Sequence, residues 1–263
     1  MADTSNAAAR LDFSGRTALV TGAASGIGRA VAKWLDRQGI EALVLVDLDG
    51  NGLASLDLSC QVRSVVGDVS DPAIWNEVET GLVRLDHAVI NAGCPPSGSE
   101  LIDTSFEDWR RVVGVHLDGA FLGMQCAMRK MREGGGGSIV LTSSAAALRA
   151  LSGTGDYAVS KAGVVHMARI AGLEGAKHGI RVNSIAPGGT DTGIWDAQPG
   201  FQEAVAAKGG DREAVIAEMG TAGTPRGEWA TAEEMADSIG FLLSGMAANL
   251  TGSLIVSDGG ITL

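Results

Sequence analysis

A tyrosine and a lysine four residues apart are the side chains whose types and spacing most clearly predict chemistry. Tyr157 and Lys161 would lie on one face of a helix, one turn apart. A free phenol titrates near ~10, and bringing it to half-ionisation at neutral pH requires about 4 kcal/mol. A unit charge ~4 Å away supplies about that much at an effective dielectric of ~20. We therefore expect Lys161 to make Tyr157 a general base almost unaided; the alternative is a partly buried ring beneath a solvated ammonium.

A glycine-rich segment near the start of the chain predicts a phosphate-binding turn. Gly22, Gly26 and Gly28 stand between a predicted strand and a predicted helix. Glycines there permit a tight turn and a close approach of the backbone, so that a pyrophosphate can sit at the helix N-terminus. The segment therefore indicates a dinucleotide site, although glycines also serve in ordinary turns.

An acidic residue at the end of the next predicted strand fits the same site. Asp47 follows the glycines by about 20 residues, where a carboxylate accepts hydrogen bonds from ribose hydroxyls and repels a 2′-phosphate. Neither Ala24 nor Leu48 offers a cation for such a phosphate. We therefore expect the cofactor to be NAD and not NADP. A cationic nicotinamide near Tyr157 would complete the shift in the pKa of the phenol.

The charge balance argues against polyanionic partners. The 263 residues carry a formal net charge of -11, which repels nucleic acid and anionic lipid. No run approaches ~18 apolar residues, so no membrane span is expected, and residues 1–10 show no secretory signal. The three cysteines and four histidines lack the spacing of disulfides or metal sites. We expect a cytoplasmic protein with no metal and with neither a nucleic-acid nor a membrane partner.

Short β-branched runs alternate with longer amphipathic runs, a pattern typical of an α/β protein with parallel strands joined by helices. Several runs are apolar throughout, as expected of strands covered on both faces. The predicted strands are Thr17–Thr21, Ala42–Asp47, Arg63–Asp68, His87–Asn91, Ser138–Thr142, Arg181–Ala186 and Leu254–Ser257. The predicted helices lie near residues 26–38, 71–83, 105–132, 156–178 and 231–244, the last opened by a capping box of Thr231 and Glu234.

One segment interrupts this alternation. Residues 189–230 contain Gly, Pro and short helical stretches, and they are too long for a plain connection in a compact domain. The apolar residues Ile194, Trp195, Phe201 and Trp229 favour a substrate lid; the alternative is a mobile surface insertion. We expect a flexible tail over residues 1–12 and a single catalytic domain over residues 13–263 that includes this lid.

Several further motifs, each weak alone, are specific in combination. They are Gly67-Asp68-Val69, Asn91-Ala92-Gly93, Ser144 thirteen residues before Tyr157, Pro187-Gly188 followed by Thr192, and Asp258-Gly259-Gly260. Together with the eight-residue segment Thr21–Gly28 and the Tyr157/Lys161 pair, they make the sequence resemble the short-chain dehydrogenase/reductase family from Arg16 to Gly260. The resemblance implies a single-domain, Rossmann-like, doubly wound parallel sheet of seven strands, with the cofactor across its carboxyl edge.

The resemblance also implies roles for individual residues. Tyr157, ionised, would take the proton of an alcohol as hydride leaves the carbon for NAD. Lys161 would lower the pKa of the tyrosine and bind the nicotinamide ribose. Ser144 would hydrogen-bond the substrate oxygen, with Ser143 as the rival for that role. The implied cofactor-binding residues are Gly22, Ser25, Gly26, Ile27, Gly28, Asp47, Leu48, Asp68, Val69, Asn91, Ala92, Gly93, Tyr157, Lys161, Pro187, Gly188 and Thr192.

One position departs from the family pattern. His116 stands where the family has an asparagine whose main-chain carbonyl, in a helix kink, holds a relay water behind the lysine. We expect His116 to keep this relay as a titratable catalytic member; the alternative is a packed helical histidine. Three cofactor-binding residues also have structural alternatives when each is taken singly. Asp68 would be a strand-end cap, Asn91 a turn residue, and Thr192 a cap of a lid helix.

The substrate is predicted only by class. Candidate pocket walls are residues 145–155, residues 94–97 and the lid, with the small residues Ala145–Ala147 leaving room beside the reacting carbon. Arg149 would either hold an acidic substrate group or be a solvated loop arginine. We expect NAD-dependent hydride transfer between a secondary alcohol and a ketone, such as a sugar, a ring diol or a hydroxysteroid.

Two other functions are left open by the sequence. One is an NADPH-preferring reductase of 3-oxoacyl thioesters, against which Asp47 and Leu48 count. The other is a dinucleotide-binding sensor that has lost turnover, which the departure at His116 leaves open. The resemblance further implies a homotetramer built through the two long helices near residues 105–132 and 156–178.

Overall fold

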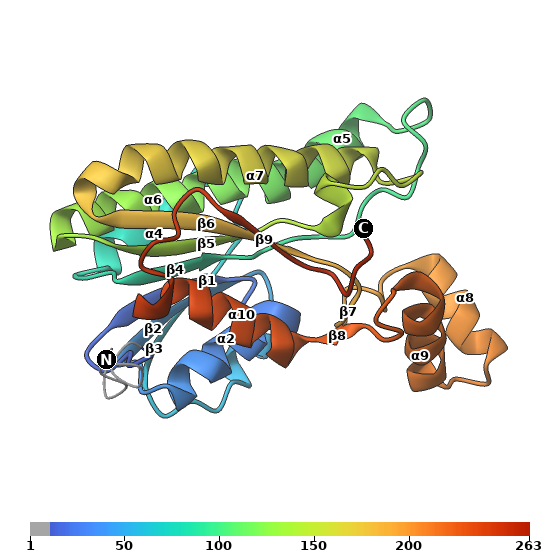
Figure 1. The fold of residues 1–263 in the computed structure, drawn as a ribbon, viewed down its shortest axis with the longest axis horizontal. Helices are drawn as coiled ribbons and strands as arrows, with labels where there is room; N and C mark the ends of the chain where they lie inside the picture. Colours follow the sequence, from blue (N-terminus) through green and yellow to red (C-terminus); the bar gives the residue numbers. More distant parts are fainter. Residues whose placement is uncertain (1–10) are drawn as a thin grey trace, which may run out of the picture.

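A seven-stranded parallel β-sheet with helices on both faces forms the body of the protein (Figure 1). The computed structural model describes residues 11–263. The predicted tail of residues 1–12 therefore lies almost entirely outside the described residues. The strands of the sheet are β1 (Thr17–Thr21), β2 (Ala42–Asp47), β3 (Gln61–Val66), β4 (His87–Ile90), β5 (Gly137–Thr142), β6 (Ile180–Pro187) and β9 (Leu254–Ser257).

The order of the strands confirms the predicted fold class. It runs β3-β2-β1-β4-β5-β6-β9, and every pairing is parallel. The chain winds outwards in one direction from β1 to β3 and in the other from β4 to β9, so the sheet is doubly wound. All seven predicted strands are present; β3 lies two residues earlier than expected, which leaves Gly67 and Asp68 in the loop that follows it.

The helices form a layer on each face of the sheet (Figure 1). α2 (Gly26–Arg37) and α10 (Ala232–Leu243) cover one face, with the short α3 (Gly50–Ala54) beside β3. α4 (Pro72–Gly81), α6 (Gly119–Gly134) and α7 (Gly155–Gly175) cover the other. α10 opens with the predicted capping box, in which Thr231 and Glu234 each accept a hydrogen bond from the backbone of the other.

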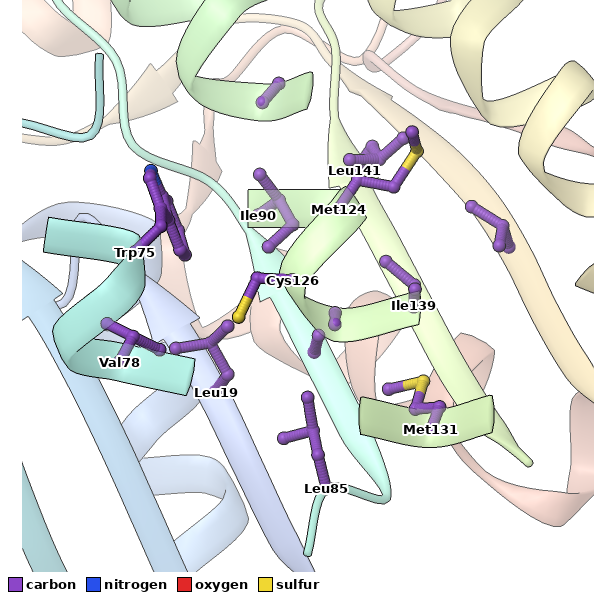
Figure 2. Close-up of a cluster of buried hydrophobic side chains, with 14 of the residues drawn as sticks. Leu19, Trp75, Val78, Leu85, Ile90, Met124, Cys126, Met131, Ile139 and Leu141 are labelled. Atoms are coloured by element: carbon purple, nitrogen blue, oxygen red, sulfur yellow. The ribbon is translucent and has the colours of Figure 1, made fainter. Parts of the chain in front are cut away.

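An apolar cluster joins the second helix layer to the centre of the sheet. Figure 2 shows the side chains of the strands meeting those of α4 and α6. Burial on both faces accounts for strands that are apolar throughout, and the scaffold it creates holds the loops at the strand ends in place. The labelled members are Leu19, Trp75, Val78, Leu85, Ile90, Met124, Cys126, Met131, Ile139 and Leu141.

The helix predicted over residues 105–132 is present and contains one irregular turn. It consists of α5 (Phe106–Val113), the π-helical turn η1 (Gly114–Asp118) and α6. A π-helical turn widens the helix by one residue, and such turns occur frequently at functional sites. His116 lies within this turn, at the position where the resemblance implied a helix kink.

The segment predicted as a lid contains secondary structure of its own. β7 (Thr190–Asp191) and β8 (Ala230–Thr231) pair in parallel and hold its two ends together. Between them, α8 (Pro199–Ala207) and α9 (Arg212–Gly223) stand at the side of the sheet, near the C-terminus (Figure 1). We refer to residues 189–230 as the lid.

Candidate active site

One cavity of about 1070 Å³ opens at the carboxyl edge of the sheet. Its wall combines the loops that follow the strands with part of the lid, at the place where a doubly wound sheet presents its ligand crevice. Among the predicted site residues, all of which the structure describes, Gly28 is the single one that does not line it. Those that do are Gly22, Ser25, Gly26, Ile27, Asp47, Leu48, Asp68, Val69, Asn91, Ala92, Gly93, His116, Ser144, Tyr157, Lys161, Pro187, Gly188 and Thr192.

The glycine segment is packed too closely for side chains. Gly22 has a φ of +67°, and a Cβ added to it would lie 2.9 Å from the Cα of Ala92. A Cβ added to Gly28 would lie 2.0 Å from the carbonyl oxygen of Gly22, so Gly28 shapes the turn from beneath. The side chain of Ser25, the N-cap of α2, makes no capping hydrogen bond. The first N–H groups of α2 are therefore left for an anion, and a pyrophosphate fits this cradle.

Asp47 is held at the cavity wall by the backbone. Its two carboxylate oxygens accept hydrogen bonds from the N–H groups of Ala24, at 2.9 Å, and Asp49, at 3.0 Å. The neighbouring Leu48 is 67% exposed and carries no charge. The guanidinium of Arg29 donates to backbone carbonyls, including that of Ala24 at 3.2 Å. A carboxylate fixed in this way, with lone pairs to spare, fits the ribose hydroxyls of a dinucleotide.

The two candidate serines have different partners. Ser143 is buried, and its hydroxyl donates to the carbonyl oxygen of Lys161 at 2.8 Å. The side chain of Ser144 instead lies beside the phenol of Tyr157, on whose pKa it has a lowering effect, and its hydroxyl accepts a hydrogen bond from the Ala146 N–H at 3.2 Å. The hydroxyl beside the phenol is therefore that of Ser144, while that of Ser143 is committed to the backbone of α7.

Burial dominates the electrostatics of the tyrosine–lysine pair. Lys161 is 4% exposed, its Nζ donates to the carbonyl oxygen of Thr142 at 2.8 Å, and it lies 5.6 Å from the centre of the Tyr157 ring. Loss of solvation lowers the pKa of Lys161 to about 8. Burial likewise raises the pKa of Tyr157, against the opposing effect of the hydrogen bond with Ser144.

The expectation that Lys161 activates Tyr157 almost unaided is therefore wrong. The sequence argument considered only how the ammonium lowers the pKa of a solvated phenol. Desolvation of the buried phenol raises this pKa and is the larger effect. An ionised Tyr157 requires positive charge beyond that of Lys161. An oxidised nicotinamide supplies such a charge when it is bound.

His116 lies edge-on to the tyrosine, with 4.9 Å between the ring centres. Its Nε2 is 2.8 Å from the carbonyl oxygen and 3.1 Å from the N–H of Cys94, so the tautomer determines which bond forms. Its Nδ1 is buried and has no hydrogen-bond partner in the described chain. Burial, and secondarily the charge of Lys161, lowers the pKa of His116 to about 3. The expectation of a titratable His116 is wrong, because the buried ring stays neutral at physiological pH.

Sequence comparisons place the chain among known proteins. A family model described as enoyl-(acyl carrier protein) reductase matches residues 22–262, from the glycine segment nearly to the C-terminus. The chain belongs to the short-chain dehydrogenase/reductase family. Over 258 residues it is 35% identical to a cis-4-hydroxycyclohexanecarboxylate dehydrogenase of Sinomonas cyclohexanicum, an alignment that covers 95% of this chain and 98% of that protein.

Solved structures of short-chain dehydrogenases/reductases match the whole fold. A levodione reductase superimposes with a TM-score of 0.85 at 30% identity, covering 95% of this chain and 98% of that one. An L-sorbose reductase of Gluconobacter frateurii, complexed with NADPH and L-sorbose, gives a TM-score of 0.88 at 28% identity, covering 96% of this chain and 98% of that one. The second neighbour binds NADPH, so family membership leaves the choice between NAD and NADP open.

In this short-chain dehydrogenase/reductase, the other predicted cofactor residues are anchored through the backbone. The N–H of Asn91 donates to the hydroxyl of Thr21 at 2.9 Å. The carboxylate of Asp68 accepts hydrogen bonds from both the N–H and the hydroxyl of Ser70, each at 2.8 Å, so Asp68 caps a turn and also lines the cavity. Thr192, at the start of the lid, packs against the glycine segment.

The substrate end of the cavity is walled by the predicted segments. Pro95 and Pro96 line one side, and Trp195 and Trp229 of the lid line another, with 4.5 Å between their ring centres. Phe201, in the lid helix α8, is buried and does not line the cavity.

Some residues of the site were not predicted. The buried carboxylate of Asp156 accepts hydrogen bonds from the N–H groups of Tyr157, at 2.7 Å, and Ser97, at 3.1 Å, and so ties the wall loop to the first turn of α7. The carbonyl of Thr142 orients Lys161, and Ile261 lines the cavity from the end of the chain. The sequence did offer a signal for Asp156, because a carboxylate stands directly before the tyrosine. Contacts made by backbone atoms, such as the Thr142 carbonyl, leave no signal in the sequence.

Within residues 11–263, no helix is long and apolar enough to cross a membrane. The same range contains no group of three or more His, Cys, Asp or Glu side chains that could hold a metal ion.

Proposed function

We propose that this enzyme is an NAD-dependent dehydrogenase/reductase of secondary alcohols and ketones. Its reaction class, hydride transfer between a CH–OH group and a nicotinamide, follows from the family. The observation that carries the proposal is that Tyr157, with Ser144 beside it, lines the same cavity as the glycine segment and Asp47. A carbinol at the phenol and a dinucleotide on the cradle would therefore meet in one enclosed space.

In this proposal Tyr157, Lys161 and Ser144 each have a separate role. Ser144 donates a hydrogen bond to the substrate oxygen and fixes its position. Tyr157 takes the hydroxyl proton in oxidation and returns it to the carbonyl oxygen in reduction. Lys161 binds the nicotinamide-ribose hydroxyls and adds positive charge near the phenol. The bound nicotinamide supplies the hydride acceptor or donor.

The remaining contacts would hold the cofactor along the carboxyl edge. Asp68 and Val69 would flank the adenine, Asn91 and its neighbours would line the middle of the crevice, and Thr192 would meet the nicotinamide carboxamide. The preference for NAD is supported by the fixed carboxylate of Asp47, the uncharged Leu48 beside it and the engagement of Arg29 by carbonyl oxygens. A 2′-phosphate there would face a carboxylate without a compensating cation.

The experiment follows NADH and NADPH absorbance over a panel of alicyclic and acyclic secondary alcohols and a 3-oxoacyl thioester. Alicyclic alcohols come first because a relative acts on 4-hydroxycyclohexanecarboxylate. We expect NAD to be preferred, Tyr157→Phe to lower kcat at least about 100-fold, and Asp47→Ala to reduce the preference for NAD about tenfold or more. Asp57→Ala, which removes an exposed carboxylate elsewhere, is the control for net charge.

Each of three other results would contradict the mechanism or favour an alternative function. Unchanged activity of Tyr157→Phe would contradict the mechanism. A wild-type preference for NADPH with the thioester would favour the 3-oxoacyl reductase, and NADH binding without turnover of any substrate would favour the sensor.

We also infer that His116 takes part as a neutral positioning residue. Within residues 11–263, its buried Nδ1 has no hydrogen-bond partner, and neither does the hydroxyl of Thr142, whose carbonyl accepts a hydrogen bond from Lys161. Buried polar atoms almost always have a partner, so these two atoms indicate a water beside Lys161. Such a water would connect the lysine to the π-helical turn. The homotetramer and the cytoplasmic location stay predictions.

A further inference from the structure

Arg149 lies on the cavity wall on the catalytic side of the sheet. It follows the short helical turn η2 (Ala145–Ala147), of which Ser144 is the N-cap, and its N–H donates to the carbonyl of Ala145 at 3.0 Å. This bond folds the segment back on itself, so the backbone of Arg149 stays close to that of Ala145, the neighbour of Ser144. Ser144 and Arg149 both line the cavity, so a substrate with its hydroxyl at Ser144 can present a second polar group to Arg149.

The charge of this arginine is not neutralised by the protein. One N–H of Arg149 donates to the carbonyl oxygen of Ile261 at 3.1 Å, and within residues 11–263 no carboxylate forms an ion pair with it. The two arginines of the lid, by contrast, are both paired with carboxylates: Arg212 contacts Asp191 at 2.7 Å, and Arg226 contacts Glu234 at 2.7 Å. Arg149 is exposed to solvent although it lines the cavity, and the bond with Ile261 leaves its other N–H groups available to an anion.

The distribution of charge within the cavity singles out this position. The carboxylates that line it, Asp47 and Asp68, follow β2 and β3 on the adenosine side of the sheet. On the other side, the charged lining residues are Lys161, which donates to Thr142, and Arg149. The chain as a whole carries a net charge of -11 and repels anions. An anionic substrate would therefore depend on one local cation at the mouth.

The cavity that Arg149 lines contains several large apolar side chains. They are Leu151, Trp195, Met219, Trp229 and Ile261. Such side chains suit a hydrocarbon body.

We propose, on the basis of the function proposed above, that the substrate is an alicyclic secondary alcohol or ketone that bears a carboxylate remote from the reacting carbon. Arg149 receives the carboxylate through charge-assisted hydrogen bonds. The reacting oxygen lies at Ser144 and Tyr157. Arg149 is thus a specificity residue, and the solvated loop arginine considered from the sequence is not the interpretation we adopt.

The first experiment compares kcat/KM for 4-hydroxycyclohexanecarboxylate and cyclohexanol. We expect the wild type to prefer the carboxylate, and Arg149→Gln to reduce the ratio of the two kcat/KM values at least about tenfold. Arg149→Lys should retain part of the ratio, and added salt should diminish it. Arg132→Gln, at the far end of α6, removes the same charge from an exposed site and should leave the ratio unchanged. A ratio near unity, or one unaffected by Arg149→Gln, would overturn the proposal.

The second experiment requires no turnover. Cyclohexanecarboxylate and its neutral carboxamide are titrated into the NADH-loaded protein, with tryptophan fluorescence of the lid as the signal. We expect the carboxylate to bind at least about tenfold more tightly than the carboxamide, and Arg149→Gln to remove that difference. Equal binding of the two compounds would overturn the carboxylate site. Oxidation of cyclohexanol together with equal binding of the two compounds would overturn this inference alone, whereas failure to oxidise any alcohol of the panel above would overturn the proposed function.

Discussion

At the residue scale, the active site depends on a buried charge. Lys161 is enclosed by α7 and β5, with the carbonyl of Thr142 as its hydrogen-bond partner, and burial lowers its pKa to about 8. An ammonium in such a place destabilises the fold below that pH, so its retention fits a role in catalysis better than one in stability.

The sign of the resulting pH dependence is fixed by this shift. Between about pH 8 and the ordinary lysine pKa of 10.5, the unfolded chain binds more protons at this site than the folded one. The free energy of unfolding should therefore rise with pH across this window, by up to ~3 kcal/mol. Lys161→Met should lose this rise and nearly all activity, whereas the exposed Lys177→Met should keep both. Urea unfolding at several pH values measures the free energy of unfolding. If it rose equally with pH in Lys161→Met and in the wild type, the lowered pKa could not belong to Lys161.

A second prediction at this scale concerns His116. Because burial lowers its pKa to about 3, the ring should contribute no ionisation to the pH–rate profile near neutrality. If Nδ1 holds a relay water, His116→Leu should lower kcat about tenfold, while His116→Asn should retain most activity. Both profiles should keep the wild-type shape. Equal activity of the two variants would indicate that His116 only packs.

At the scale of elements, Arg212 connects the lid to the cofactor side of the cavity. From α9 it forms ion pairs with Asp191, at 2.7 Å, and Asp196, at 2.8 Å, and it donates to the carbonyl of Thr192 at 3.3 Å. Its guanidinium also lies 5.6 Å from the centre of the Phe201 ring. One side chain therefore fastens both lid helices to the segment that bears Thr192.

Removing this link should loosen the lid without altering the chemical groups. We expect Arg212→Met to raise the KM for NAD about tenfold, with a smaller change in kcat. Lys208→Met breaks the exposed Lys208–Glu218 pair of the same lid, at 2.7 Å, and should change KM less than about twofold. Steady-state kinetics tests this, and equal effects of the two variants would show that Arg212 has no special part.

At the scale of the whole molecule, the two long helices leave apolar side chains uncovered. Phe121 of α6 and Val159, Ile170 and Leu173 of α7 are exposed in the single chain, with Leu173 at 81%. Apolar exposure on neighbouring helices is typical of a subunit interface. The acidic surface, by contrast, disfavours contacts elsewhere between copies.

We therefore expect the predicted homotetramer to assemble through this face. Light scattering should give four times the mass of one chain, and Leu173→Glu should give a smaller particle. Leu263→Glu, at a still more exposed position outside this face, is the control. A wild-type protein with the mass of one chain would contradict the prediction.

The sequence by itself determined the scaffold and most of the residues that come together at the site. Apolar runs, glycines and turn residues act locally, so all seven strands, the capping box and the glycine cradle could be predicted. Residues at the ends of parallel strands must meet at one edge, and the predicted residues accordingly line one cavity.

The tertiary structure decided how these residues behave. Desolvation reversed the expected shift in the pKa of Tyr157 and kept His116 neutral, because both depend on groups packed around them from distant segments. Other features also arise from contacts that the spacing of residues in the sequence does not encode. They are the π-helical turn, the hydrogen bond from Ser143 to the carbonyl of Lys161, and the hydrogen bond from Arg149 to the carbonyl of Ile261. Spacing reveals which side chains converge, but their charge and orientation depend on what encloses them.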